Sequence, residues 1–406
     1  MPTIKFRTLG CKVNQYDTQS IRERFLEYGF KEVRKNEKAD TYLINTCTVT
    51  SSADQKSFSI IRNCIRENPK AKIIVTGCMV KNDRYSLAKI RGISLIISRS
   101  FFGEGATDFY GHTRAFLKIQ DGCDNFCSYC KVPLARGRSR SRPLAEVIKE
   151  GGVLAARGFK EIVLTGICLG SYGKDIGKGT DLVKVITGLE KIEGLSRIRL
   201  SSIEAGDVTD ALINKMSKSE KLCPHLHIPI QSGDDEILKK MKRKYSRKYY
   251  LDLVNKIKRK VPQVSITTDC LVGFPQENED NFQNTLSLIK NIMPLKTHIF
   301  PYSARKGTCA YKFKGKKSLA LIKERCQRLK EVSGECASSY KNFFLNKSVD
   351  VLIEGRFKQS HGFWQGYASN YIRVLVKSKD NLKNKIVSLR LQEIRGDAII
   401  GNRIER

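Results

Sequence analysis

The sequence lacks any long apolar run. No stretch of its 406 residues approaches the roughly 20 consecutive apolar residues that a transmembrane helix requires. The segment Pro2 to Lys12 is strand-like, contains charges, and has no unbroken apolar core of the kind found in secretion signals. Hydrophobic residues make up 40% and charged residues 28% of the chain, which is typical of a folded globular protein. We therefore expect a cytoplasmic protein without a membrane partner.

Acidic side chains are also scarce. The chain has 41 Asp and Glu against 74 Lys and Arg, a formal net charge of +33. Residues 131–142 carry five basic residues and no acid, and residues 236–260 carry eleven basic residues against two acidic ones. Such an excess favours a polyanion partner, above all nucleic acid, because phosphate neutralisation releases counterions. The alternative is a general lysine richness that reflects an AT-rich genome.

A disulfide framework is not expected, although the chain has thirteen cysteines. A reducing cytosol keeps thiols free, so metal binding or catalysis is the first explanation for them. The segment Cys123-Asp-Asn-Phe-Cys127-Ser-Tyr-Cys130 is the most informative. Three thiolates leave one iron of a four-iron cluster without a protein ligand. An open iron can hold the amine and carboxylate of S-adenosylmethionine, so this spacing indicates radical chemistry.

The first hundred residues alternate strand-like and helix-like patterns. Ile4–Leu9, Thr41–Asn45 and Lys72–Thr76 are expected to be strands, and Thr18–Tyr28 and Ala53–Asn68 amphipathic helices. This alternation predicts a small α/β domain with a mostly parallel sheet.

Three further cysteines follow these three strands. Cys11, Cys47 and Cys78 each come directly after a strand, and Gly10 and Gly77 precede two of them. The carboxyl ends of parallel strands meet at one edge of the sheet, so the thiols should converge as a second cluster site. Glycine would let the backbone approach a bulky cofactor. The alternative is that small cysteines pack at strand ends.

The remaining chain has two further patterns. Strands are expected at Ala115–Gln120, Glu161–Leu164, Arg197–Ser201, Leu226–Ile230, Ser265–Leu271 and Thr297–Pro301, with helices between them. Six such units predict an incomplete β/α barrel with its active site above the carboxyl ends of the strands. After a helical stretch, Ser318–Phe344, strands are expected at Val349–Glu354, Phe363–Ala368, Tyr371–Val376 and Ile386–Ile394. They predict a small β-barrel of OB-like size, whose mixed aromatic and basic residues either stack on RNA or form its core.

The fold class is therefore α/β with three domains. We expect an N-terminal parallel-sheet domain at residues 1–106, a partial (β/α)6 barrel at 107–344, and a small β-barrel at 345–406.

Several segments, in this order, resemble a known family. They are Leu9-Gly-Cys-Lys-Val-Asn-Gln-Tyr-Asp17, Asn45-Thr-Cys-Thr-Val49, Thr76-Gly-Cys78, Ile119-Gln-Asp-Gly-Cys123, Ser201-Ser-Ile-Glu204, Leu226-His-Ile-Pro-Ile-Gln-Ser-Gly233, Val272-Gly-Phe-Pro275 and His298-Ile-Phe-Pro-Tyr-Ser303. The chain resembles the radical-SAM methylthiotransferases over essentially its full length. That resemblance implies a radical-SAM barrel between a three-cysteine N-terminal domain and a C-terminal TRAM domain.

Segments around Cys11 and Cys123, and Arg136–Arg142, resemble the subgroup that methylthiolates threonylcarbamoyladenosine at position 37 of tRNA. Gln276, Ala304 and Cys168 depart from the usual pattern near the cofactor. Isopentenyladenosine or a ribosomal-protein aspartate are alternative substrates. A non-catalytic RNA-binding protein with structural iron–sulfur clusters is an alternative of another class. It would need a fourth ligand for each cluster, and no fourth cysteine lies near either set in the sequence.

The resemblance also implies cofactors and site residues. Cys123, Cys127 and Cys130 would hold the 4Fe–4S cluster that cleaves S-adenosylmethionine, and Cys11, Cys47 and Cys78 an auxiliary 4Fe–4S cluster that carries sulfur. A second S-adenosylmethionine would give the methyl group. The S-adenosylmethionine pocket would include Tyr129, Gly166, Glu204 and Gln231. The alternative for each of them is a buried, hydrogen-bonded residue of the barrel without a role in binding. The candidates for RNA contact are Arg136, Arg138, Arg140, Arg356 and Arg373.

Neither His225 nor His227 is assigned as a ligand, because two histidines on one strand face are typical of a core. The implied partners are the tRNA anticodon stem-loop, a reducing protein such as flavodoxin or ferredoxin, and a sulfur donor. A monomer is expected.

Overall fold

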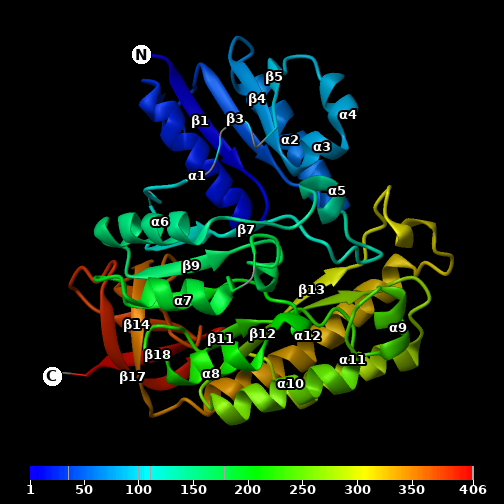
Figure 1. Ribbon diagram of the computed structural model, residues 1–406, viewed down its shortest axis with the longest axis vertical. Coiled ribbons are helices and arrows are strands. Elements are labelled where there is room, and N and C mark those ends of the chain that lie inside the picture. The colour runs from blue at the N-terminus through cyan, green and yellow to red at the C-terminus, as the bar shows by residue number, and fades with distance from the viewer. Residues whose placement is uncertain are drawn as a thin grey trace.

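A five-stranded parallel sheet forms the N-terminal end of the molecule (Figure 1). The computed structural model describes residues 1–404 except 35, 99, 100, 102, 104, 110 and 178. The strand order is β2-β1-β3-β4-β5. The strands are β1 (Thr3–Thr8), β2 (Lys31–Glu32), β3 (Thr41–Thr46), β4 (Lys72–Gly77) and β5 (Leu95–Ile96), and the helices are α1 (Lys12–Glu27), α2 (Ser51–Glu67), α3 (Cys78–Asn82) and α4 (Arg84–Ala88). Every residue of β3 is buried, as expected for a central parallel strand covered on both faces.

The helix α1 begins at Lys12, six residues before the position that periodicity predicts. Its first turns bury Asn14 and Asp17 as well as Val13, and these polar side chains contact other parts of the protein. An apolar stripe is therefore absent where the helix starts, and the hydrophobic pattern does not reveal it.

Six parallel strands form the middle of the molecule. They are β6 (Arg114–Lys118), β9 (Glu161–Thr165), β10 (Arg197–Leu200), β11 (His225–His227), β12 (Ser265–Val272) and β13 (Lys296–Pro301). Two three-stranded sheets, β6-β9-β10 and β11-β12-β13, are joined by parallel bridges from Ile198 to Leu222 and from Ser202 to His227. The result is the partial six-stranded barrel that the sequence predicts.

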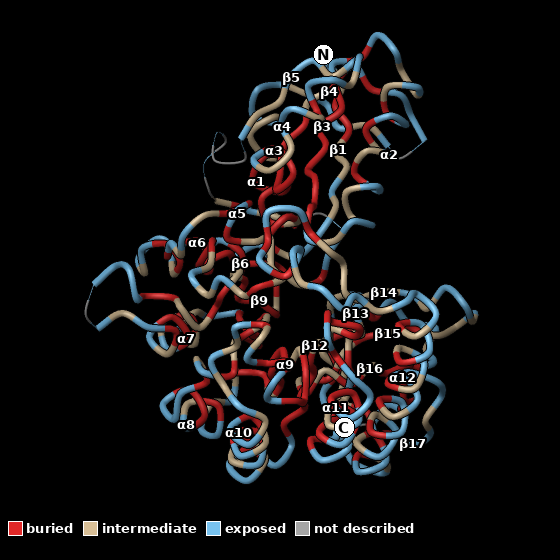
Figure 2. Tube along the Cα trace, turned by 90° about the vertical axis from the view of Figure 1, so that its right-hand side faces the viewer, coloured by how far each residue is buried: buried red, intermediate tan, exposed pale blue. Residues whose placement is uncertain are grey.

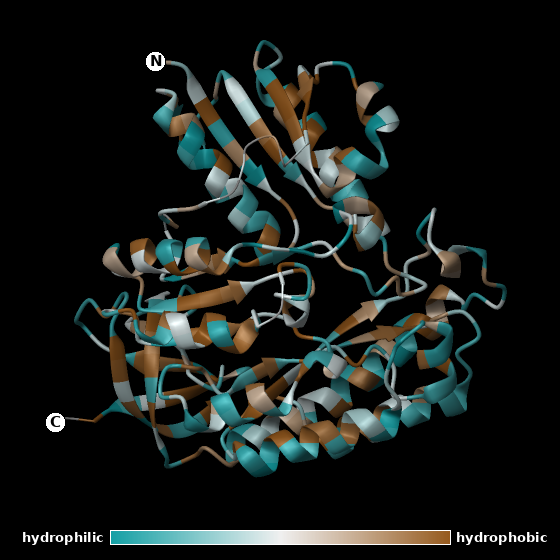
Figure 3. Cartoon of the chain, in the orientation of Figure 1, coloured by the Kyte–Doolittle hydropathy of each residue, from teal (hydrophilic) through white to brown (hydrophobic). Residues whose placement is uncertain are grey.

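Helices enclose this partial barrel. They are α6 (Leu144–Ala156), α7 (Leu182–Glu190), α8 (Asp210–Lys218), α9 (Asp235–Lys240), α10 (Arg247–Lys260), α11 (Glu279–Ile292) and α12 (Leu319–Asn342), while β7 (Gln120–Asp121), α5 (Val132–Arg136) and β8 (Arg140–Ser141) lie beneath the N-terminal sheet. In α10, Tyr250, Leu253, Val254 and Ile257 are buried at helical spacing, and Ser246 caps its first turn. Each such side chain contributes about 1.5–3 kcal/mol on burial. Figure 2 shows buried residues along the strands. Figure 3 shows that β9 is apolar, whereas α10 is largely hydrophilic.

The C-terminal residues form a closed five-stranded barrel, as predicted. Its strands are β14 (Ser348–Arg356), β15 (Phe363–Ala368), β16 (Arg373–Lys377), β17 (Ile386–Arg395) and β18 (Ala398–Arg403), closed in the order β14-β15-β16-β18-β17. Trp364 is 4% exposed and its indole N–H donates to Ser378 O at 3.2 Å, so this aromatic side chain belongs to the barrel core.

The closed barrel packs against the amino ends of the partial-barrel strands. Arg199 of β10 is fully buried, its Nε lies 2.6 Å from Glu161 Oε1, and its Nη1 donates to Ser369 O at 2.8 Å. Tyr371 stacks on His225 of β11 with ring centroids 4.5 Å apart. The closed barrel thus forms a floor beneath the partial barrel. Among the described helices, none has the length and apolar character needed to cross a membrane.

Candidate functional site

A cavity of about 570 Å³ lies between the N-terminal sheet and the partial barrel. Its walls combine three parts of the chain. The N-terminal domain contributes Cys11, Lys12, Cys47 and Cys78, the barrel contributes Lys131, Val132, Gly166, Ser201, His225, His227, Thr267, Asp269 and His298, and the closed barrel contributes Tyr371. The cavity therefore lies above the carboxyl ends of the barrel strands and continues into the barrel lumen.

The first cysteine triad converges at one edge of the sheet. Cys11, Cys47 and Cys78 follow β1, β3 and β4 and line the same cavity. Glycine is required beside them. A Cβ on Gly10 would lie 3.1 Å from Cys47 Cβ, and one on Gly77 would lie 2.4 Å from Thr46 O; both glycines have φ above +100°.

The sulfur atoms of this triad suit iron. Burial raises the pKa of Cys47 to about 11, so the metal-free thiol is protonated and iron binding would release the proton. Arg136 Nε donates to Cys78 Sγ at 3.2 Å, which supplies a cationic donor for a thiolate. Three thiols on one cavity wall are a donor set that fits an iron–sulfur cluster.

The second triad lies on the loop that follows β7, and each of its sulfurs accepts a hydrogen bond. Asn125 N–H donates to Cys123 Sγ at 3.5 Å, Val132 N–H to Cys130 Sγ at 3.4 Å, and Arg243 Nη1 to Cys127 Sγ at 3.3 Å. Such donors stabilise thiolates around a cluster. Burial raises the pKa of Cys130 to about 12, so here too the metal-free thiol is protonated. The loop leads to the cavity, because Lys131 and Val132 line it.

A fourth cysteine, Cys168, lies close to this triad in space. From the sequence, no fourth cysteine was expected near either triad, and for this triad that expectation is wrong. Cys168 is 3% exposed and hydrogen-bonds to Cys123, and that bond lowers the pKa of Cys123 and raises the pKa of Cys168. Cys168 also lies 3.1 Å from Ser171 Oγ, so its sulfur has partners other than iron.

The residues predicted for the S-adenosylmethionine pocket have different surroundings. Gly166 lines the cavity, while Tyr129 packs edge-on against Phe274 with ring centroids 6.5 Å apart. Gln231 has a positive φ of 62° and bridges to β12 through its backbone. Glu204 forms an ion pair with Arg243.

Sequence analysis missed Arg243. It joins Glu204 to the sulfur of Cys127, and its side chain is 4% exposed. Its position in the basic run of residues 236–260 made it look like one more surface charge.

The predicted RNA-contacting arginines separate into two groups. Arg138, Arg140 and Arg356 are exposed, and Arg373 is partly exposed and paired with Asp397 at 2.9 Å. Arg136 is a correction, because only 1% of its side chain is exposed and its guanidinium is directed into the protein.

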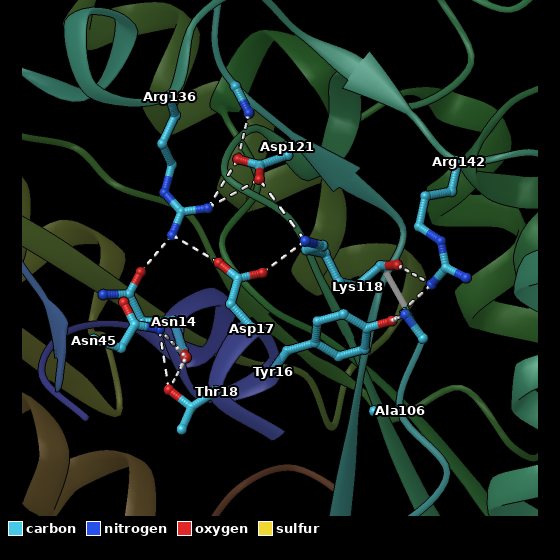
Figure 4. Close-up of polar contacts among 12 residues, drawn as sticks. Asn14, Tyr16, Asp17, Thr18, Asn45, Ala106, Lys118, Asp121, Arg136 and Arg142 are labelled. Atoms are coloured by element: carbon cyan, nitrogen blue, oxygen red, sulfur yellow. Dashed lines mark hydrogen bonds and ion pairs between the residues drawn. The ribbon is translucent and has the colours of Figure 1, made fainter. Parts of the chain in front are cut away.

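Arg136 belongs to a buried network that joins the N-terminal domain to the barrel (Figure 4). Its Nη1 donates to both carboxylate oxygens of Asp121 at 2.9 and 3.0 Å, and its Nη2 to Asp17 Oδ2 at 3.3 Å and to Asn14. Lys118 Nζ donates to Asp17 Oδ1 at 2.6 Å. Arg136 and Lys118 thus pair with the carboxylates of Asp17 and Asp121, and these contacts hold α1 against β6 and α5.

A second polar cluster lies in the barrel lumen, where sequence analysis expected core histidines. His225 Nε2 and His227 Nδ1 both hydrogen-bond to Thr267 Oγ1, at 3.0 and 2.9 Å, and His227 Nε2 lies 3.1 Å from Asp269 Oδ1. His298 faces His227 with ring centroids 5.6 Å apart. These residues line the cavity, so the lumen is polar and not only a packed core.

Comparison with known proteins is consistent with this architecture. Residues 3–98 match the model described as "Uncharacterized protein family UPF0004" and residues 117–289 match the Radical SAM superfamily. Among solved structures, the radical S-adenosylmethionine methyltransferase TsrM of Kitasatospora setae superimposes with a TM-score of 0.54 at 13% identity, covering 74% of each chain, which shows a shared fold.

Curated relatives extend over nearly the whole chain. "Threonylcarbamoyladenosine tRNA methylthiotransferase MtaB" of Bacillus subtilis is 38% identical over 96% of this chain and 94% of its own. "tRNA-2-methylthio-N(6)-dimethylallyladenosine synthase" of Acetivibrio thermocellus is 32% identical over 97% of this chain and 89% of its own. With one cysteine triad lining the cavity, a second on the loop that leads to it, and relatives of this similarity and extent, the chain belongs to the radical-SAM methylthiotransferase family of enzymes.

Proposed function

We propose that this enzyme adds a methylthio group to carbon 2 of N6-threonylcarbamoyladenosine at position 37 of tRNA. The observation that carries the proposal is that one set of three thiols lines the cavity from the N-terminal sheet, while a second set lies on the loop after β7, directly before the cavity-lining Lys131 and Val132. One cluster held by three thiols suffices to cleave S-adenosylmethionine. The second set of thiols therefore needs another role, and in this proposal that role is sulfur insertion.

The family uses a 4Fe–4S cluster and S-adenosylmethionine, and the proposal adds a second cluster and a second S-adenosylmethionine. When bound, these groups would supply a 5′-deoxyadenosyl radical, a sulfur atom and a methyl group. Cys123, Cys127 and Cys130 would hold the first cluster, and Cys11, Cys47 and Cys78 the auxiliary one. An outside reductant and a sulfur donor complete the requirements.

The protein's own residues orient the clusters and S-adenosylmethionine and shield them from water. Arg243 holds the sulfur of Cys127 and the carboxylate of Glu204, and Arg136 holds the sulfur of Cys78. Tyr129, Gly166, Glu204 and Gln231 are proposed to border the S-adenosylmethionine pocket. Tyr371 of the closed barrel forms the floor of the cavity. The adenine that enters from the opposite end therefore occupies a cavity that is closed beneath it, and this closure excludes bulk water from the reacting carbon.

The tRNA substrate is supported by the names of the relatives and by the charge of the surface. Relatives named for threonylcarbamoyladenosine are 36–38% identical, and those named for dimethylallyladenosine 32–33%. Arg138, Arg140, Arg356 and Arg373 would contact the anticodon stem-loop, and Arg356 already lies over the Trp364 ring at 4.5 Å. In this proposal, residues 1–106 carry the auxiliary cluster, 107–344 the radical chemistry, and 345–406, a TRAM-like barrel, the RNA.

Alanine substitutions in the two triads test the proposal. Replacing Cys123, Cys127 or Cys130 is expected to abolish both 5′-deoxyadenosine formation and methylthiolation. Replacing Cys11, Cys47 or Cys78 is expected to leave 5′-deoxyadenosine formation measurable and to stop sulfur insertion. Full methylthiolation after loss of Cys11 would refute the two-cluster assignment.

Mass spectrometry of tRNA nucleosides from cells that lack the protein tests the substrate. Loss of methylthio-threonylcarbamoyladenosine is expected. Loss of the methylthio-dimethylallyladenosine instead would assign the enzyme to the other subgroup.

A further inference from the structure

Lys12 stands in the wall of the cavity. It is the first residue of α1 and directly follows Cys11. Within the part of the chain that the structure describes, no hydrogen bond or ion pair reaches its ammonium group. Lys118, also on the interior side of this interface, is paired with Asp17 at 2.6 Å. An unpaired ammonium inside a protein costs free energy, and an anionic ligand would remove that cost.

Basic side chains surround Tyr371 at the floor of the lumen below Lys12. Burial by itself would raise the pKa of Tyr371, yet the neighbouring Arg114, Lys12 and Arg199 lower it. Glu161 is already engaged by Arg199 at 2.6 Å, and Arg114 by Glu354 at 2.5 Å. Glu161 and Glu354 are thus paired with arginines, and Asp269, which lines the cavity, lies 3.1 Å from His227; no ion pair of the described residues reaches Lys12.

Further polar groups of the same wall are unsatisfied. In the described chain, the buried Ser201 Oγ and His225 Nδ1 have no hydrogen-bond partner. No hydrogen bond links His298 to another described residue, although it lines the cavity. His227 differs, because both of its ring nitrogens are engaged, by Thr267 and by Asp269. Among the described residues, Lys12, Ser201, His225 and His298 therefore each have a polar atom without a hydrogen-bond partner.

The candidate substituents on the adenine differ in the chemistry they would bring here. A threonylcarbamoyl group ends in a carboxylate and a hydroxyl and carries a urea, whereas a dimethylallyl group is wholly apolar. An apolar group against Lys12 would leave the ammonium and the other polar groups unpaired, which is the strongest means a site has to reject a ligand.

We propose that Lys12 and His298 form a subsite in the barrel lumen that binds the carboxylate of the threonylcarbamoyl group and so selects this substrate. This inference rests on the proposed function. S-adenosylmethionine also carries an amino-acid carboxylate, so the shared chemistry is an α-amino-acid carboxylate and the experiment must separate the two sources.

The test compares Lys12→Met with Lys248→Met, both in the holoenzyme. Met keeps the length of the side chain and removes its charge, and the control lysine on α10 is 85% exposed. With tRNA that carries threonylcarbamoyladenosine, Lys12→Met is expected to lower kcat/KM about 10- to 100-fold, mainly through the KM for tRNA, because a hydrogen bond to a charged group is lost. Lys248→Met should match the wild type, and Lys12→Arg should recover part of the loss.

A second substrate separates charge from folding. On tRNA whose threonylcarbamoyl carboxylate has been converted to an amide, the wild type is expected to lose a similar factor, while Lys12→Met should treat both tRNAs alike. Iron content and the rate of 5′-deoxyadenosine formation without tRNA should be unchanged in Lys12→Met, which shows that the clusters and the cofactor pocket are intact.

Two results would overturn the inference. One is a Lys12→Met enzyme that still prefers the carboxylate substrate to the amide. The other is a raised KM for S-adenosylmethionine with an unchanged KM for tRNA, which would assign the carboxylate to the cofactor. A wild-type enzyme inactive on threonylcarbamoyladenosine tRNA is a distinct result, because it would overturn the proposed function itself.

Discussion

Replacing Arg136 by Met should separate the N-terminal domain from the barrel more effectively than any surface change. The guanidinium makes hydrogen bonds to Asp121 at 2.9 and 3.0 Å and to Asp17 at 3.3 Å, and the exposed fractions of these three side chains are 1%, 8% and 7%. Without Arg136, the buried carboxylates of Asp17 and Asp121 lose this cation; Lys118 lies 2.6 Å from Asp17 and 3.9 Å from Asp121.

The magnitude follows from the charge left behind. Removing one partner of a buried ion pair costs about 3–5 kcal/mol, because the remaining charge stays desolvated. Domains are typically stable by about 5–15 kcal/mol, so this is a large share of the total. The matched control is Arg138→Met, two residues away, whose side chain is 77% exposed and whose loss should change stability by no more than about 0.5 kcal/mol.

Urea unfolding of iron-free protein, followed by circular dichroism, measures the effect without a contribution from cluster release. Arg136→Met is expected to show an early transition of the N-terminal domain that is absent in Arg138→Met. Adding Asp121→Asn should recover part of the loss, because it restores the balance of charge. Equal stability of the two arginine variants would refute the view that this network holds the domains together.

Three further outcomes are expected. Cys168→Ala should retain 5′-deoxyadenosine formation and a four-iron cluster signal by Mössbauer spectroscopy, since Cys123, Cys127 and Cys130 are the proposed ligands and the sulfur of Cys168 contacts Ser171 Oγ at 3.1 Å; loss of the cluster would contradict this. Asp234→Ala should cost about 0.5–2 kcal/mol at neutral pH, because Asp234 caps α9. Although burial opposes it, hydrogen bonds from Asn284 and Ile237 lower the pKa of Asp234 below 3.8, so its stabilisation is present above that pH and is lost as the pH falls through the lowered pKa; the difference between variant and wild type should shrink there in calorimetry. Arg199→Met should release the closed barrel to limited proteolysis, whereas Arg403→Met, 49% exposed, should not.

The sequence predicted the strands and most helices because their apolar periodicity is strong. The cysteine triads were also visible, since each follows a predicted strand and parallel strands end at one edge. The confirmed fold class rests on the same local patterns. The start of α1 was missed because its first buried residues, Asn14 and Asp17, are polar.

Long-range polar contacts were beyond sequence reasoning. Arg136 and Arg243 each lie in a basic stretch, and nothing local distinguishes them from exposed neighbours such as Arg138. Cys168 is far from Cys123 in the sequence but adjacent in space, because consecutive barrel strands bring their following loops together. Tyr371 was assigned to a strand of the closed barrel, and only the packing of that barrel against β11 brings its ring to the cavity.

The position of Tyr371 has a consequence for synthesis on the ribosome. Both cysteine triads, Lys12 and all six strands of the partial barrel leave the ribosome before the closed barrel is complete. Until then Arg199 and His225 lack their partners at Ser369 and Tyr371, and the lumen has no floor. A nascent chain therefore has both cysteine triads before it has an enclosed cavity.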